Sequence, residues 1–196
     1  MMLNDLLKDR RIILGSSSPR RQQFMELMGI PFQVRLNPVE EIYPSELQGH
    51  QISDYLAQLK ADAFKSQLGE HEILITSDTV VWHRGKSLEK ASDAEEAFQM
   101  LRTLSNDRHQ VITSVCFTTP SGKKLVHEST EVRFRALSDK EIHHYVDVYN
   151  PYDKAGAYGI QEWVGLVGIE HIEGSYTNVV GLPTQLVYKT LLEILS

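Results

Sequence analysis

The chain has 196 residues and a formal net charge of −6, and hydrophobic residues make up 41% of it. This composition is typical of a globular protein and excludes disordered and fibrous classes. The acidity argues against a nucleic-acid-binding protein, whose contact surface is usually basic, and no apolar run reaches the roughly 18 residues of a membrane span.

The cysteine count and the N-terminal segment predict a cytoplasmic protein. Cys116 is the single cysteine, so an internal disulfide is excluded, and its apolar surroundings (VITSVCF) indicate a small buried side chain. Residues 1–14, MMLNDLLKDRRIIL, carry charges throughout their apolar stretch and therefore do not resemble a secretion signal.

The hydrophobic patterns predict alternating strands and helices. In chain order they predict a strand at 11–14, a helix at 19–28, a strand at 31–36, an acidic loop at 37–50, a helix at 53–68, a strand at 72–82 and a helix at 92–104. A hairpin of strands at 109–118 and 124–134 follows, then helices at 138–149 and 183–195. Strands and helices are interleaved, so we expect one α/β domain over residues 1–196 with helices flanking a twisted sheet. Because of the hairpin, we expect this sheet to be mixed and not all-parallel.

Several details of these helices are testable. Ser92 with Glu95, and Ser138 with Glu141, predict capping boxes at two helix starts. The expected buried face of the 19–28 helix consists of Phe24, Met25, Leu27 and Met28, and that of the 53–68 helix of Tyr55, Leu56, Leu59, Ala63 and Phe64.

The stretch SSSPRR at 16–21 places two cations at the start of a helix. Arg20 and Arg21 stand at the positive end of the helix dipole, which costs up to about 1 kcal/mol per charge without a compensating anion. Their helical neighbours three and four residues on are not acidic. Two interpretations stay open: arginines that point into water, and an anion site built from helix amides, serine hydroxyls and guanidinium groups.

Three carboxylates are candidates for chemistry. Asp78 follows the apolar run EILIT and precedes two valines, so it is expected to be partly buried, as a backbone partner, a metal ligand or a general base. Glu40 and Glu41 lie in the acidic loop, where a solvated tip competes with a role in holding a hard cation such as Mg²⁺ together with phosphates. The histidines show no zinc-ligand spacing.

The stretch DKAGAYGIQ at 153–161 surrounds Lys154 with small residues. Small residues let the backbone approach a ligand closely. Gln161 adds an amide that both donates and accepts, which suits the edge of a base.

In combination, these stretches resemble the Maf family of cytoplasmic nucleoside triphosphate pyrophosphatases. The segments LGSSSPRR, the glutamate pair, SDTVV, LEKA, LSNDRHQVITSV, PYDKAGAYGIQ and GSYTNVVGLP occur in the family's order, from about Ile12 to Leu192. The resemblance implies an elongated, two-lobed α/β fold like that of inosine triphosphatases, with a central cleft. It also implies a divalent metal cofactor, Mg²⁺ or Mn²⁺, and a homodimer.

The resemblance also implies roles for individual residues. Asp78 matches the general base that activates water, Glu40 matches a catalytic glutamate with Glu41 as the neighbouring candidate, and Lys90 and Lys60 match site lysines. Glu40, Glu41 and Asp78 are thereby the candidate metal ligands, Ser16, Arg20 and Arg21 fall on the phosphate-binding loop, and Lys154 lies beside the base pocket. Arg20, Thr79 and Gln161 match positions associated with base choice and favour the branch acting on dTTP and UTP rather than on 7-methyl-GTP.

Two departures from the family pattern bear on these expectations. Thr76-Ser77 stands where Gly-Ala usually precedes the aspartate, and Glu162 stands where glycine is common. Two alternatives to the dTTP/UTP pyrophosphatase stay open: a pyrophosphatase for another base, and a nucleotide-binding regulator of septum formation and cell division with little hydrolysis.

Overall fold

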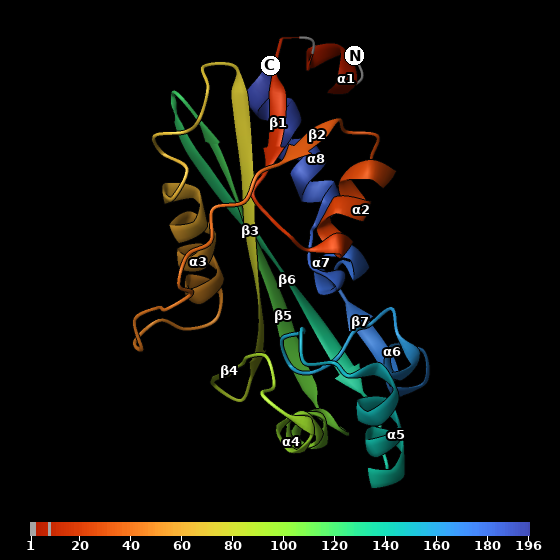
Figure 1. The fold of residues 1–196 in the computed structure, drawn as a ribbon. Coiled ribbons are helices and arrows are strands. Elements are labelled where there is room, and N and C mark those ends of the chain that lie inside the picture. The colour runs from red at the N-terminus through yellow and green to blue at the C-terminus, as the bar shows by residue number, and fades with distance from the viewer. Residues whose placement is uncertain (1–2, 8) are drawn as a thin grey trace.

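Three long strands form the centre of the fold in this computed structural model, which describes residues 3–7 and 9–196. They are β3 (Glu72–His83), β5 (Arg108–Thr119) and β6 (Gly122–Phe134). They pair antiparallel along nearly their whole length and run through both ends of the elongated molecule (Figure 1). The long central strand and the hairpin predicted from the sequence are thus confirmed. Met1, Met2 and Lys8 of the N-terminal stretch lie outside the described residues.

The remaining strands make the sheet mixed, as predicted. They are β1 (Arg11–Leu14), β2 (Phe32–Val34), β4 (Lys86–Leu88) and β7 (Ile169–Glu173). The seven-stranded sheet has the order β2-β1-β3-β5-β6-β7, and β4 pairs with β3 off this path. Strand β1 is parallel to both β2 and β3, whereas every other pairing is antiparallel.

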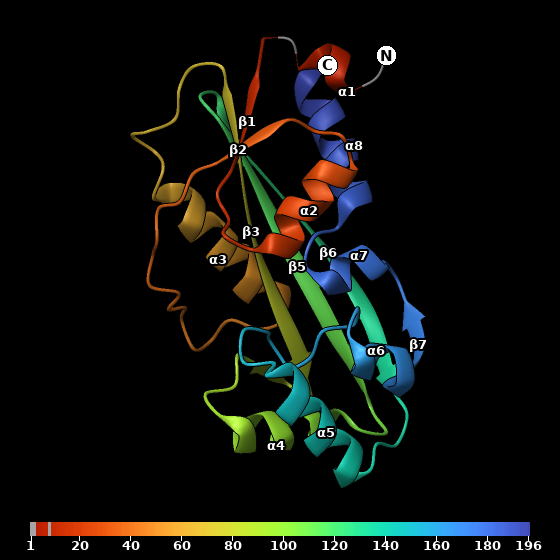
Figure 2. The same ribbon diagram turned by 45° about the vertical axis from the view of Figure 1, so that its right-hand side comes forward.

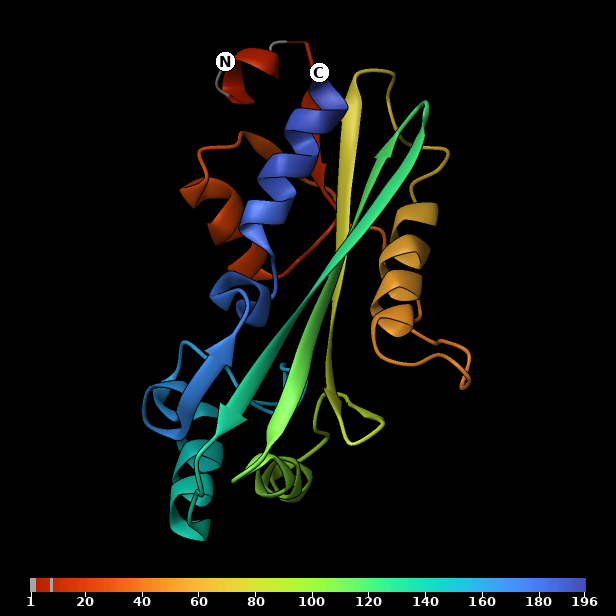
Figure 3. The same ribbon diagram turned by 180° about the vertical axis from the view of Figure 1, so that it is seen from behind.

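Helices cover both faces of the sheet. The helices are α1 (Leu3–Leu6), α2 (Pro19–Leu27), α3 (His50–Asp62), α4 (Ala94–Leu104), α5 (Asp139–Tyr149), α6 (Trp163–Gly168), α7 (Tyr176–Val180) and α8 (Thr184–Leu195). Helix α3 lies on one face, and α2, α7 and α8 lie on the other (Figures 1 and 3). Helices α4, α5 and α6 gather around the end of the sheet opposite to α1 (Figure 2).

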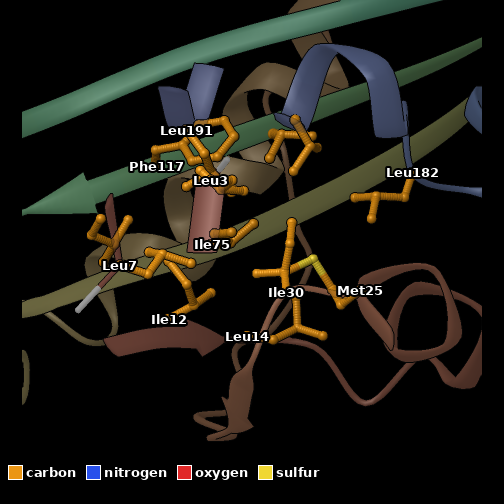
Figure 4. Packing of buried hydrophobic residues seen from close by; sticks show 13 residues of the cluster. Leu3, Leu7, Ile12, Leu14, Met25, Ile30, Ile75, Phe117, Leu182 and Leu191 are labelled. Carbon is orange, nitrogen blue, oxygen red and sulfur yellow. The ribbon is translucent and has the colours of Figure 1, made fainter. Parts of the chain in front are cut away.

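The core follows from the alternation of side chains along the central strands. Ile73 and Ile75 of β3 face the helices α2 and α8, where they pack with Met25 and Leu191 (Figure 4). Leu74 faces α3 and packs in a separate cluster that contains the buried Cys116, as its apolar context predicts. Asp78 therefore lies on the α3 face of β3, because it is an even number of residues from Leu74.

Two helices differ from their predicted bounds. Helix α3 begins at His50 and ends at Asp62, not at 53–68, because Ser53 is no cap: its buried hydroxyl donates to the carbonyl oxygen of His50. At the start of α4 the cap is Asp93 rather than Ser92, since the Asp93 carboxylate accepts from the backbone N–H of Glu96.

The other detailed expectations were mostly correct. The Ser138–Glu141 capping box is present at the start of α5. On α2 the predicted apolar face is wrong at Leu27, whose exposed fraction is 74%, and on α3 it is wrong at Tyr55, which is also exposed.

A partly buried ion pair links the segment after β2 to the start of β3, and it leads to a stability prediction. Arg35 donates to both carboxylate oxygens of Glu72 at 2.9 Å, and the Gly69 backbone N–H adds a third bond. The Arg35 hydrogen bonds are the main reason that the pKa of Glu72 falls from its ordinary 4.5 to about 2. A lowered carboxyl pKa stabilises the fold at pH values above 4.5, and this contribution is lost as the pH falls towards about 2.

We expect Glu72→Gln to lower the free energy of unfolding by about 2 kcal/mol at pH 7, because it removes the buried carboxylate that pairs with Arg35. Urea unfolding at pH 7 and at pH 2 to 3 measures the difference, which should shrink at the lower pH. Glu193→Gln removes a pair with Lys124 in which both side chains are exposed, and it should change little. Equal losses in the two variants would contradict this account.

Candidate active site

A cleft of about 660 Å³ crosses the middle of β3, where this strand lacks a neighbour on one edge. Pairing with β1 ends at Ile75, and pairing with β4 begins at Val81. Residues 76–80 of β3 therefore have a free edge on this side. Side chains from both faces of β3 reach the cleft around this edge, so the neighbours Asp78 and Thr79 both line it although they point to opposite faces.

The cleft brings together all but one of the residues predicted from the sequence. Its lining includes Ser16, Arg20, Arg21, Glu41, Lys60, Asp78, Thr79, Lys90, Lys154 and Gln161. They come from the loop before α2, the first turn of α2, the loop after β2, helix α3, strand β3, the segment after β4 and the 153–161 loop. These segments surround the middle of β3 (Figures 1 and 2).

Asp78 is a buried carboxylate with one close cation. Its exposed fraction is 7%, and its Oδ1 lies 2.6 Å from the Nζ of Lys60. Burial raises the pKa of Asp78 above its ordinary value, while Lys60 and Arg21 oppose that shift. The carboxylate is therefore more basic than a free aspartate, which is the property required of a general base.

Of the two loop glutamates, Glu41 faces the cleft. Its Oε1 lies 3.0 Å from the same Lys60 ammonium that contacts Asp78. Glu40 is exposed and does not belong to the cleft lining. The structure thus brings Glu41, and not Glu40, together with Asp78.

Arg21 closes the free edge of β3. Its Nη1 donates to the carbonyl oxygen of Ser77 at 2.8 Å and to the Ser16 hydroxyl at 3.4 Å. Its Nε donates to the carbonyl oxygen of Gly181 at 2.9 Å, and its Nη2 to the Thr79 hydroxyl at 3.1 Å. Burial lowers the pKa of this guanidinium, and Asp78 opposes the shift. Since a guanidinium has five N–H groups, one remains for a ligand.

The start of α2 opens into the cleft without a side-chain cap. Ser18 is the N-cap residue, but its side chain makes no capping hydrogen bond, and Pro19 occupies the first helical position. Residues 15–21 all line the cleft. The free amides at this helix start therefore add to the positive potential of the site.

The opposite wall carries the residues expected near the base. Arg20 donates to Asp153 at 3.2 Å, which links α2 to the 153–161 loop. In that loop Lys154 is buried, whereas Gln161 is exposed within the cleft lining. Lys90 is exposed and sits beside the loop, because its backbone forms a bridge with Ala155.

Comparison with known proteins shows the family of this chain. A family model described as "Maf-like protein" matches residues 11–194. The chain belongs to the Maf family. Its relatives include the dTTP/UTP pyrophosphatase of Flavobacterium johnsoniae, with 55% identity over 97% of this chain and 98% of that protein. The protein of the same name from Bacteroides fragilis is 49% identical over 94% of this chain and 96% of that protein.

Among solved structures, the Ham1 protein of Staphylococcus aureus is similar at a TM-score of 0.47 and 16% identity, covering 64% of this chain and 72% of that one. This likeness is too distant to bear on function. No helix in the described part of this Maf-family chain is long and apolar enough to cross a membrane.

The Maf-family site fits a divalent cation only in part. Within residues 3–7 and 9–196, no three His, Cys, Asp or Glu side chains are gathered so that they could hold a metal ion by themselves. Two carboxylates, Asp78 and Glu41, nevertheless converge on the single Lys60 ammonium. Two carboxylates completed by substrate phosphates are a usual donor set for Mg²⁺, so these residues fit a cation that arrives with the nucleotide.

Two contacts beside the cleft were missed by sequence reasoning. The hydroxyls of Thr113 and Thr79 form a hydrogen bond of 3.0 Å. The Thr113 hydroxyl also donates to the carbonyl oxygen of Asn178 at 3.1 Å. Since the Thr113 proton goes to that carbonyl, Thr79 donates to Thr113. With Arg21 already donating to it, Thr79 keeps only a lone pair for a ligand. The motifs ITSV and NVVGLP contain Thr113 and Asn178, but no local signal marks their pairing.

Proposed function

We propose that this Maf-family protein hydrolyses dTTP and UTP to the nucleoside monophosphate and pyrophosphate. The observation that carries the proposal is the buried, basic Asp78 beside Lys60, at the centre of a cleft with the uncapped start of α2. The names and high identities of the relatives support the same activity. A cleft of about 660 Å³ has room for a nucleotide.

In the proposed mechanism, Asp78 takes a proton from the water that attacks the α-phosphorus, and pyrophosphate leaves. The remaining N–H of Arg21, the ammonium of Lys60 and the α2 amides bind the phosphate oxygens and stabilise the charge that develops on them. A divalent cation held by Asp78 and Glu41 would add further neutralisation of the triphosphate. We assign this carboxylate role to Glu41 rather than to Glu40, because Glu41 lines the cleft.

The base preference rests on the wall that carries Gln161. Its amide has an oxygen that accepts and an NH2 group that donates, which matches the N3–H and the neighbouring carbonyl of uracil and thymine. Pyrophosphate release over dTTP, UTP, CTP, GTP and 7-methyl-GTP, with Mg²⁺ or Mn²⁺, tests the proposal. We expect the highest kcat/KM with dTTP and UTP. Best turnover of 7-methyl-GTP would contradict the base assignment, and no release with any nucleotide would favour a binding protein.

Lys60 predicts a pH effect on this activity. Because the Lys60 cation holds the pKa of Asp78 below the value that burial alone would give, Lys60→Met should raise that pKa further. The base must be ionised to act, so the acidic limb of the pH profile should move to higher pH. We expect kcat/KM at acidic pH to fall roughly tenfold relative to its value on the alkaline plateau. Lys65→Met, an exposed lysine just after α3, is the matched control. An unshifted acidic limb would contradict the assignment of Asp78 as the base.

The family resemblance alone supports two further proposals, a homodimer and a cytoplasmic location. Light scattering of the purified protein tests the first, and cell fractionation tests the second.

A further inference from the structure

A chain of polar contacts runs along the wall of the cleft opposite α2. The ammonium of Lys154 lies 2.6 Å from Asp153 Oδ1 and 3.1 Å from Glu162 Oε1. The other oxygen of Asp153 accepts from Arg20. Two cations thus alternate with two carboxylates, so this chain of contacts carries no net charge.

Glu162 is the less exposed of the two carboxylate partners of the Lys154 ammonium, whereas Asp153 is the closer one, at 2.6 Å against 3.1 Å. The Lys154 side chain is only 10% exposed, so its charge requires a close counter-ion. The Asp153 side chain is 62% exposed and is screened by water, whereas that of Glu162 is 20% exposed. Glu162 therefore supplies the less screened of the two counter-charges that hold the ammonium.

A buried phenol fixes Glu162 in turn. The hydroxyl of Tyr145, a fully buried residue, donates to Glu162 Oε2 and accepts from the backbone N–H of Gly159 at 3.0 Å. Gly159 lies so close that a Cβ there would be 2.9 Å from the Glu162 carboxyl carbon and 3.1 Å from the Gln161 amide nitrogen. The carboxylate is therefore packed against the segment that carries Gln161.

This arrangement limits what Lys154 can bind. An ammonium has three N–H groups and no acceptor, and two of them are used by Asp153 and Glu162. One N–H remains in the cleft lining, on a cation whose charge is already compensated. Such a group suits a neutral acceptor, such as a carbonyl oxygen, better than it suits a triphosphate. An amino group at the same place would be unfavourable, because two hydrogen-bond donors cannot form a hydrogen bond with each other.

We propose that Glu162 is a positioning residue for base selection: anchored by Tyr145, it holds Lys154 so that its last N–H binds a carbonyl oxygen of the pyrimidine. The proposal rests on the pyrophosphatase activity proposed above. It predicts preference for uracil and thymine, which carry a carbonyl at C4, over cytosine, which carries an amino group there.

The test compares UTP and CTP hydrolysis by the wild type and by Glu162→Gln. Glutamine keeps the size and still accepts from Tyr145, but it removes the charge that holds Lys154. We expect KM for UTP to rise about tenfold with kcat within about threefold, and the UTP-to-CTP ratio of kcat/KM to fall about tenfold. Tyr145→Phe and Gly159→Ala, which disturb the same carboxylate from two other sides, should shift the ratio in the same direction.

Glu170→Gln is the control, because Glu170 pairs with Arg133 on the surface at 2.8 Å and takes no part in the cleft lining. It should leave KM and the ratio unchanged. An unchanged UTP-to-CTP ratio in Glu162→Gln would overturn the inference, and so would an equal loss with both nucleotides or a fall in kcat alone. A wild type that releases no pyrophosphate would instead refute the proposed function, so the two failures are distinct.

Discussion

Replacing Asp78 by asparagine is expected to lower kcat with dTTP by about 10²–10⁴-fold, as removal of a positioned general base does. Asparagine has the same shape but cannot take the proton of the attacking water. Steady-state pyrophosphate release measures the loss. Asp54→Asn is the matched control, because Asp54 is a carboxylate of α3 that accepts from Ser114 outside the cleft lining. Its kcat should stay within about threefold of the wild type.

The Asp78→Asn substitution is expected to preserve or increase the stability of the fold. A carboxyl group whose pKa is raised by burial stabilises the fold at pH values below its ordinary pKa, where the group is protonated. That contribution is lost as the pH rises through the raised pKa, so ionised Asp78 is unfavourable for the fold at neutral pH. Lys60 keeps its contact with Glu41 in the variant. A lower Tm together with unchanged turnover would mean that Asp78 serves the fold and not the reaction.

Arg21→Lys is expected to lower the free energy of unfolding by about 2–4 kcal/mol and to reduce activity on every nucleotide. A lysine cannot replace the planar guanidinium, which joins the carbonyl oxygens of Ser77 and Gly181 across the free edge of β3. Those buried carbonyls would lose a charged donor. Urea unfolding and pyrophosphate release with dTTP and CTP measure the two effects.

Arg20→Ala is the comparison for Arg21. The Arg20 side chain is 30% exposed and forms an ion pair with the exposed Asp153, so little stability should be lost. Because that contact leads to the 153–161 loop, its effect should depend on the base. Equal losses of activity on all nucleotides in both variants would refute the assignment of Arg21 to phosphate binding and of Arg20 to base choice.

Most of the fold could be predicted from the sequence because its elements have strong local signals. The strand at 72–82 is apolar on both faces, and the hairpin turn and the Ser138 cap are marked by their residue types. The errors arose where tertiary packing decides. Ser53 carries the residue type of a cap, yet a buried contact between α3 and β5 uses its hydroxyl, which contacts that of Ser114 at 2.7 Å.

The site could be predicted as a set of residues but not as a geometry. The motifs predicted ten residues that line the cleft, because residue types such as paired carboxylates and clustered cations are visible in a sequence. The choice between Glu40 and Glu41 depends on which way a loop faces. The role of Arg21 depends on a carbonyl oxygen 160 residues away in the sequence, and that of Glu162 on a buried phenol of α5. Such partners come only from the fold.

The most direct test of the central claim is dTTP hydrolysis by the wild type in ¹⁸O-labelled water, with both products identified by mass spectrometry. Attack of an Asp78-activated water on the α-phosphorus predicts equal amounts of dTMP and pyrophosphate, with the label in dTMP. Label in pyrophosphate, or release of orthophosphate and dTDP, would contradict it.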